Sequence, residues 1–346
     1  MKFNHLKLPS LGDIVLFGAA LRILLLVYAL FVPDFIYAGD SGEYLALARG
    51  FLETGVYAAE TDRPLPPDSV RPPVYPAFLS LLLLLGDGTP FLVLLVQVLL
   101  SVGNIWLAHR LAMQLGAGEN AACLAALVLA IDLSSILYAA TVMAETLFTT
   151  LLLLFASALV RAIEIPNPRN ITALSVFAAG LTLTKPVATF LPLVSAALML
   201  FLAPGQPSKK TLAATGHLVL VVALLLPWGL RNARKHDYLG ISTVQGFNLL
   251  YYNGALAKAR AEGTGIDAAE DALTEELHAR LSTDSPTTGD YTRAMQRLGV
   301  QTVFAHFDSY VLLHARGMLA MLVDPGRINL QRLLSGQPSA NGLLEA

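Results

Sequence analysis

The sequence has 346 residues, of which 55% are hydrophobic and 14% charged, and its mean hydropathy is +0.60. Soluble domains carry charges on about a quarter of their residues, so this composition excludes an ordinary soluble enzyme and indicates a polytopic membrane protein. The formal net charge of −2 is accompanied by no basic patch, so nucleic acid is not an expected partner.

Nine apolar stretches follow one another along the chain. They are Leu11–Val32, Val74–Leu85, Phe91–Leu111, Ala121–Ala140, Ala144–Ile163, Ile171–Leu183, Val187–Leu202, Leu212–Leu230 and Val303–Val323. A helix needs about 20 residues to cross about 30 Å of hydrocarbon, so the second, sixth and seventh stretches are short and are expected to tilt little, start in a cavity or turn back. The pattern predicts an all-α, polytopic transmembrane helical bundle of about 8–9 membrane segments, with short interfacial helices in its outward-facing loops.

The N-terminal segment carries Lys2 and Lys7 and has no small-residue cleavage pattern after its apolar run, which indicates a retained first helix. Basic residues favour the cytoplasmic side, so residues 33–73 are expected to form a first outer loop. Seven acidic residues and three arginines in that loop agree with this orientation.

The orientation of later segments depends on Val74–Leu85. If this stretch only dips into the outer side, Glu145, Lys185 and Arg231 share the outward side with Asp40. If it crosses fully, those assignments flip until another segment fails to cross. The charge distribution favours the first alternative.

A second large polar interval covers residues 231–302 and is expected to be an outer loop with helices of its own. Ile266–Leu281 is rich in Ala, Glu and Leu, with leucines four residues apart on one face. Residues 285–290 break this helix, and a second helix from Tyr291 is expected to run into the last span. The chain is therefore expected to form one transmembrane domain over residues 1–330, followed by a polar tail over 331–346.

Six motifs occur in one order along the chain: GDSGEYLALARGFLETGVY, RPPVYPAFLSLLL, MAETLF, TKP, PWGLRN with STVQGFNLL, and HFDSYVLLHARG. Together they resemble the GT-C superfamily of membrane glycosyltransferases, most closely family 39 and its bacterial relatives, the protein O-mannosyltransferases and the lipid A aminoarabinose transferase. The resemblance covers about Leu11 to Pro325. It implies a GT-C type fold and an enzyme that moves a sugar from a polyprenyl-phosphate donor to an acceptor hydroxyl of an envelope glycan, lipid or protein.

The resemblance implies that Asp40 is the general base, because it matches the acidic position of the family's first outer loop. A carboxylate there can take the acceptor proton as the oxygen attacks C1 opposite the leaving phosphate, which inverts the anomeric centre. The alternative for Asp40 is a helix N-cap ahead of Tyr44. Glu43 lies three residues on, where it is expected either to assist Asp40 or to complete a capping box.

The resemblance also assigns the donor phosphate to basic residues. Arg71 stands in the family's Lys/Arg-Pro-Pro motif, and its planar guanidinium suits a phosphate diester; the alternative is an arginine that snorkels at the interface. Charges at apolar spans are costly and are usually functional or paired, so Lys185 and Arg231 are further phosphate candidates, with interface anchoring as the alternative. Glu145 is a candidate partner that neutralises one of them.

Three other features complete the candidate site. Asn232 follows Arg231 directly, and Tyr75 is expected either in an interfacial aromatic belt or stacked on a sugar. The seven histidines are scattered without ligand spacing, so the sequence predicts no metal centre and no cofactor, and leaves open a divalent cation between Asp40 and the phosphate. Cys123 is expected to pack as a small apolar residue, and Arg22 to snorkel or pack between helices.

The sequence therefore predicts an integral membrane protein, in the bacterial cytoplasmic membrane, with its active site facing the periplasm and membrane lipids around it. Two other classes stay open: a transporter or flippase of lipid-linked sugars, and a non-catalytic member of the family. The family usually continues with further transmembrane helices after the equivalent of Val323, which marks 331–346 as a candidate truncation point.

Overall fold

The computed structural model describes residues 8–59, 63–281, 285–323 and 331, and all regular secondary structure in these ranges is helical. This confirms the all-α fold class. The described residues group into two compact units. Unit 1 contains those of Met1–Gly55 and Pro73–Leu225, and unit 2 those of Val56–Pro72 and Leu226–Asp324.

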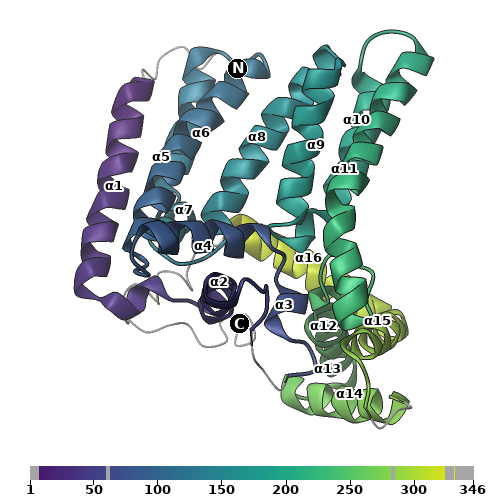
Figure 1. Ribbon diagram of the computed structural model, residues 1–346. Coiled ribbons are helices and arrows are strands. Elements are labelled where there is room, and N and C mark those ends of the chain that lie inside the picture. Colours follow the sequence, from purple (N-terminus) through teal and green to yellow (C-terminus); the bar gives the residue numbers. More distant parts are fainter. Residues whose placement is uncertain (1–7, 60–62, 282–284, 324–330, 332–346) are drawn as a thin grey trace. The chain divides into compact units, whose positions relative to one another are not determined.

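Unit 1 is built around long helices that Figure 1 shows side by side. They are α1 (Leu11–Phe31), α5 (Phe91–Gln114), α6 (Glu119–Ile131), α8 (Glu145–Glu164), α9 (Pro168–Thr182), α10 (Leu191–Leu202) and the first part of α11 (Pro207–His236). The other elements of this unit connect them: η1 (Pro33–Ile36), α2 (Ser41–Thr54), α4 (Val74–Leu85), α7 (Leu133–Ala139) and η2 (Pro186–Phe190). In Figure 1, α4 lies across the ends of the long helices, and it packs against α2.

Four helices in the described residues are long and apolar enough to cross a membrane: α1, α5, α8 and α11, with the bent pair α6 and α7 as a fifth. The predicted 8–9 spans are therefore not confirmed. The 12 residues of α4 rise only about 18 Å, well short of the hydrocarbon thickness. The predicted span Val303–Val323 is not one helix, because the chain breaks between Ala305 and Phe307.

The bend between α6 and α7 has a local cause. These helices meet at 55°, and Asp132 stands at the junction. Its Oδ2 accepts a hydrogen bond of 2.6 Å from the backbone N–H of Ser135, so the aspartate acts as N-cap and starts a new helix inside an apolar run. The predicted span Ala121–Ala140 is therefore two helices.

Arg22 is a helix-packing residue, which corrects the alternative of a snorkelling side chain. It is fully buried, and its guanidinium donates to the Ser101 hydroxyl and to the carbonyls of Gly18, Ala130 and Leu129 at 2.7–3.1 Å. These bonds satisfy the buried cation and tie α1 to α5 and α6.

A buried histidine joins three other helices of unit 1. His217 of α11 is fully buried, and its two ring nitrogens lie 2.9 Å from the hydroxyls of Ser175 in α9 and Ser195 in α10. Both ring nitrogens are thus satisfied without a charged partner. The imidazole fixes how these three helices are placed along one another.

Unit 2 consists of shorter helices. They are α3 (Pro67–Val70), the end of α11, α12 (Val244–Phe247), the π-helix η3 (Asn248–Ala255), α13 (Leu256–Glu262), α14 (Ile266–Arg280), α15 (Thr288–Ala305) and α16 (Phe307–Val323). Leu273 and Leu277 of α14 are buried, as their spacing predicts. A capping box between Thr287 and Asp290 starts α15.

The π-helix η3 packs closely against α15 through glycine. A Cβ on Gly299 would lie 2.9 Å from backbone atoms of Leu249 and Leu250, closer than real Cβ contacts come. Only glycine therefore lets these two helix backbones approach so closely. Two buried side chains of α15, Met295 and Leu298, complete the core on this side.

Candidate functional site

Asp40 stands at the N-cap position of α2 in unit 1, but its side chain makes no capping hydrogen bond. The local turn is fixed by Ser41 instead, whose Oγ accepts from the Ala38 N–H at 2.9 Å and donates to the Val142 carbonyl at 2.8 Å. The capping alternative for Asp40 is therefore wrong, and so is the capping box with Glu43. Asp40 and Glu43 are both only half-buried. A general base needs this exposure, because an acceptor must be able to reach its carboxylate.

Glu145 and Lys185, 40 residues apart in sequence, form an ion pair in unit 1. The Lys185 Nζ lies 2.7 Å from the Glu145 Oε1, with 30% and 23% of the two side chains exposed. This confirms the interpretation of Glu145 as the partner of a basic residue. An ammonium has three N–H donors, so the pair leaves Lys185 the capacity to bind an additional acceptor.

A polar cavity of about 220 Å³ opens beside Glu145. It is lined by Ser101, Asn104, Asp132, Ser134, Ser135, Tyr138, Glu145, Thr146 and Thr149. The Asn104 Oδ1 and the Glu145 Oε2 are buried and find no hydrogen-bond donor within the part of the chain that the structure describes. Buried acceptors of this kind are costly, so the cavity suits a guest with several hydroxyl groups, or water.

Arg231 is the centre of a hydrogen-bond network in unit 2. One terminal nitrogen, NH1, donates to the Asp68 carbonyl at 2.8 Å, to the Asn232 Oδ1 at 2.9 Å and contacts the His236 Nε2 at 3.1 Å. The other, NH2, donates to the Tyr57 carbonyl at 2.7 Å and to the Asp68 carboxylate. The guanidinium also lies against the rings of Tyr57 and Trp228, with its carbon 5.5 and 4.8 Å from their centroids.

Asp68 is the acidic partner of this network, and only 3% of its side chain is exposed. Its Oδ2 also lies 2.7 Å from the Lys235 Nζ and 3.1 Å from the His236 Nε2. Burial opposes ionisation of Asp68, but the hydrogen bonds from His236, Lys235 and Arg231 outweigh it and hold the pKa of Asp68 well below its usual range. Three basic groups thus converge on one ionised carboxylate.

Arg71 follows Asp68 by three residues, and hydrogen bonds hold its backbone in place. Its backbone N–H donates to the Pro67 carbonyl at 2.7 Å, and its carbonyl accepts from the Tyr57 hydroxyl at 2.9 Å. The backbone of Arg71 is therefore fixed on both sides, while its side chain is only half-buried. Sequence reasoning missed Asp68, although an acidic residue just before Arg-Pro-Pro was visible.

Two predicted site residues have structural roles instead. Asn232 is buried, and its amide donates to the Gly240 carbonyl at 2.8 Å, which holds the chain after α11. Tyr75 is fully buried in the core of unit 1, where its hydroxyl donates to the Gln97 Oε1 at 2.8 Å and its ring meets Tyr44 edge-on. No ring face is open to a sugar or to the interface, so both expectations for Tyr75 are wrong.

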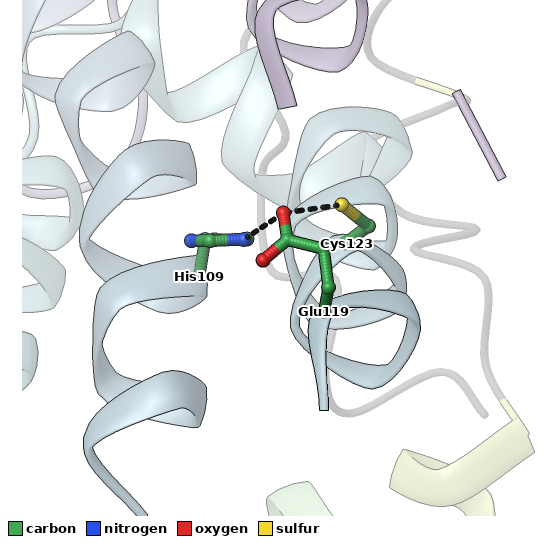
Figure 2. Close-up of side chains that lie close together, drawn as sticks. All are labelled: His109, Glu119 and Cys123. Atoms are coloured by element: carbon green, nitrogen blue, oxygen red, sulfur yellow. Dashed lines mark hydrogen bonds and ion pairs between the residues drawn. The ribbon is translucent and has the colours of Figure 1, made fainter. Parts of the chain in front are cut away.

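The structure brings one of the scattered histidines beside two other side chains that could bind a metal. His109 of α5 lies beside Glu119 and Cys123 of α6, as Figure 2 shows, with ligand atoms all within 4.8 Å of one another. Sequence reasoning overlooked this cluster because it sought histidine pairs with ligand spacing. The sequence did contain a signal for it. Glu119 and Cys123 are four residues apart on one helix, and Glu119 follows His109 by ten residues across a short turn. Cys123 is buried, as expected.

The predicted site residues are divided between the two units. Unit 1 contains Asp40, Glu43, Glu145 and Lys185, and unit 2 contains Arg71 and Arg231. Within unit 1 the structure joins Glu145 to Lys185. Within unit 2 it joins Arg231 through Asp68 to the segment that carries Arg71.

Residues 70–230 match the family model described as dolichyl-phosphate-mannose-protein mannosyltransferase. No curated protein and no solved structure matches the chain. The matched segment contains Arg71, Glu145 and Lys185 and includes three of the four helices long enough to span a membrane, the last of them in large part. This match and the apolar helices together support a membrane glycosyltransferase, and residues 70–230 are similar to a family of the GT-C superfamily.

Proposed function

We propose that the protein is an inverting glycosyltransferase that moves a sugar from a polyprenyl-phosphate donor to an acceptor hydroxyl at the outer face of a bacterial cytoplasmic membrane. The acceptor is an envelope glycan, a lipid or a protein. The match of residues 70–230 to a family named for a polyprenyl-type donor is the observation that carries this proposal.

Asp40 acts as the general base in this reaction. The acceptor oxygen attacks C1, the bond from C1 to the phosphate oxygen breaks, and the electron pair leaves with polyprenyl phosphate while Asp40 takes the hydroxyl proton. Support comes from the half-buried carboxylate, which is not used to cap α2. Glu43, one turn along the same helix, orients the acceptor.

Basic side chains neutralise the leaving phosphate in this proposal, and no metal ion is required. Arg71 binds the phosphate as a planar fork, and Lys185, held by Glu145, adds a point charge. Arg231 is a positioning residue, because both its terminal nitrogens are engaged by protein groups that fix the segment before Arg71.

Transfer of radiolabelled sugar from a panel of polyprenyl-phosphate donors tests the proposal, in membranes that contain the protein and with envelope extract as acceptor. Asp40→Asn is expected to abolish transfer by the folded protein. The matched control Asp34→Asn changes an exposed aspartate of the same loop and should retain activity. Full activity of Asp40→Asn would remove Asp40 as the base.

Kinetics test Arg71 as a ligand of the donor phosphate. Arg71→Gln should raise the donor KM and lower turnover, whereas Arg49→Gln, an exposed arginine of α2, should change neither. Donor that crosses the membrane without being consumed would point to a flippase instead. Binding of donor without transfer or transport would point to a non-catalytic member.

A further inference from the structure

Two helices of unit 1 meet in a short hairpin that brings three metal-binding side chains together. The chain leaves α5 at Gln114 and enters α6 at Glu119, and the turn uses Gly116 at φ +84°, a conformation that favours glycine. His109 projects from the last turns of α5 toward the start of α6. Glu119 is the first residue of α6, and Cys123 lies one turn further along it.

The spacing of these ligand atoms already suits a tetrahedral ion. The His109 Nε2 lies 3.1 Å from the Glu119 Oε1, and the Cys123 Sγ lies 3.6 Å from the same oxygen. Zinc binds nitrogen and oxygen at about 2.1 Å and thiolate at about 2.3 Å, so tetrahedral ligands stand about 3.4 Å (N to O) and about 3.6 Å (S to O) apart. Both distances to Glu119 thus lie close to those of a zinc site, and the His109 Nε2 and the Cys123 Sγ lie within 4.8 Å of each other, against about 3.6 Å on a tetrahedral zinc.

We propose that His109, Glu119 and Cys123 bind a zinc ion that fastens α5 to α6. Thiolate with imidazole favours zinc over calcium or magnesium, which take oxygen ligands. Cys123 loses its proton on binding, and the ion replaces the hydrogen bonds of Glu119 to His109 and Cys123.

The burial pattern leaves one side of this site open. His109 and Cys123 are 7% and 4% exposed, whereas 63% of the Glu119 side chain is exposed. A metal can thus reach the two buried ligands past Glu119, which closes over it, and the fourth position falls to water. The site uses none of the residues assigned above to glycosyl transfer.

Metal binding to the whole protein tests the proposal. The chain is purified in detergent through a tag without histidines, treated with chelator and reductant, and dialysed against zinc. One zinc per chain should be retained, and zinc should raise the unfolding temperature. His109→Ala and Glu119→Gln should weaken binding by at least about tenfold. His278→Ala, which removes an exposed histidine of α14, should bind as the unchanged protein does.

Cobalt provides a second readout that depends on one atom. Cys123 is the single cysteine of the chain, so any thiolate-to-cobalt charge-transfer band must arise from it. The band should appear on titration with Co²⁺ and be absent in Cys123→Ser, whose fold is checked by its helical circular dichroism. Failure to retain zinc, or zinc and cobalt binding that is the same in all variants, would overturn the proposal and leave a hydrogen-bonded cluster only.

Discussion

Replacing Asp68 by asparagine would test whether the network of unit 2 depends on one buried charge. Asparagine keeps the size of the side chain and one acceptor oxygen but removes the negative charge. Arg231 and Lys235 then lie close together without a counter-charge, and His236 loses its carboxylate contact. The change therefore isolates the electrostatic contribution of Asp68 from its packing.

The expected loss of stability follows from how buried each partner is. Removing one member of a fully buried ion pair costs about 3–5 kcal/mol. Only 3% of the Asp68 side chain is exposed, but Arg231 and Lys235 are 24% and 40% exposed and can regain water. We therefore expect a loss of about 2–3 kcal/mol, which lowers an unfolding temperature by roughly 4–12 °C.

Thermal unfolding of the purified protein measures this effect. The matched control is Glu262→Gln, which removes the charge of an exposed i,i+4 pair with Lys258 and should cost only about 0.3–0.5 kcal/mol. If Asp68→Asn lowers the unfolding temperature no more than this control does, the buried network is not a source of stability.

The pKa of Asp68 gives the same reasoning a pH dependence. Because the folded-state pKa lies below the unfolded value of about 3.9, the ionised carboxylate stabilises the fold at all pH values above that, and the stability is lost as pH falls below it. The stability difference between the unchanged protein and Asp68→Asn should therefore shrink on acidification below about pH 4. A difference that grows with falling pH would refute the assignment.

Two further predictions concern packing and pairing. Gly299→Ala should lower the stability by about 1–3 kcal/mol in thermal unfolding, because its Cβ meets the backbone of Leu249, which cannot move aside; Gly317→Ala, in open space on α16, should not be destabilising, and equal effects would contradict the packing argument. A double-mutant cycle of Glu145→Gln and Lys185→Met should show a coupling of about 1 kcal/mol, and strictly additive losses would mean that the pair contributes nothing.

The sequence predicted the features that depend on local pattern or cost. Leucines four residues apart located α14, and the expense of a charge in an apolar span pointed to Glu145 as the partner of one of the basic residues, which the structure identifies as Lys185. The same reasoning marked Arg22 as a costly charge. Only the structure shows that Arg22 binds the carbonyls of α6 and not lipid headgroups.

Other features depend on contacts that hydropathy does not report. An apolar run reads as one span whether or not Asp132 starts a second helix inside it. The role of Arg231 depends on Asp68, 163 residues away in sequence. Tyrosine is a residue type that is common at membrane interfaces, so the sequence could not distinguish an interfacial Tyr75 from a buried one. Only the packing of Tyr44 and Gln97 around it shows that it is buried.

The histidine between α9, α10 and α11 has a consequence for biogenesis. Slipping one of these helices by a single turn, about 5.4 Å, would break at least one of the bonds from His217 to Ser175 and Ser195. Lipid tails offer no substitute donor or acceptor, so a misaligned insertion intermediate stays penalised until it finds the native alignment. The hydrogen bonds of one imidazole thereby favour the native alignment of these three helices during membrane assembly.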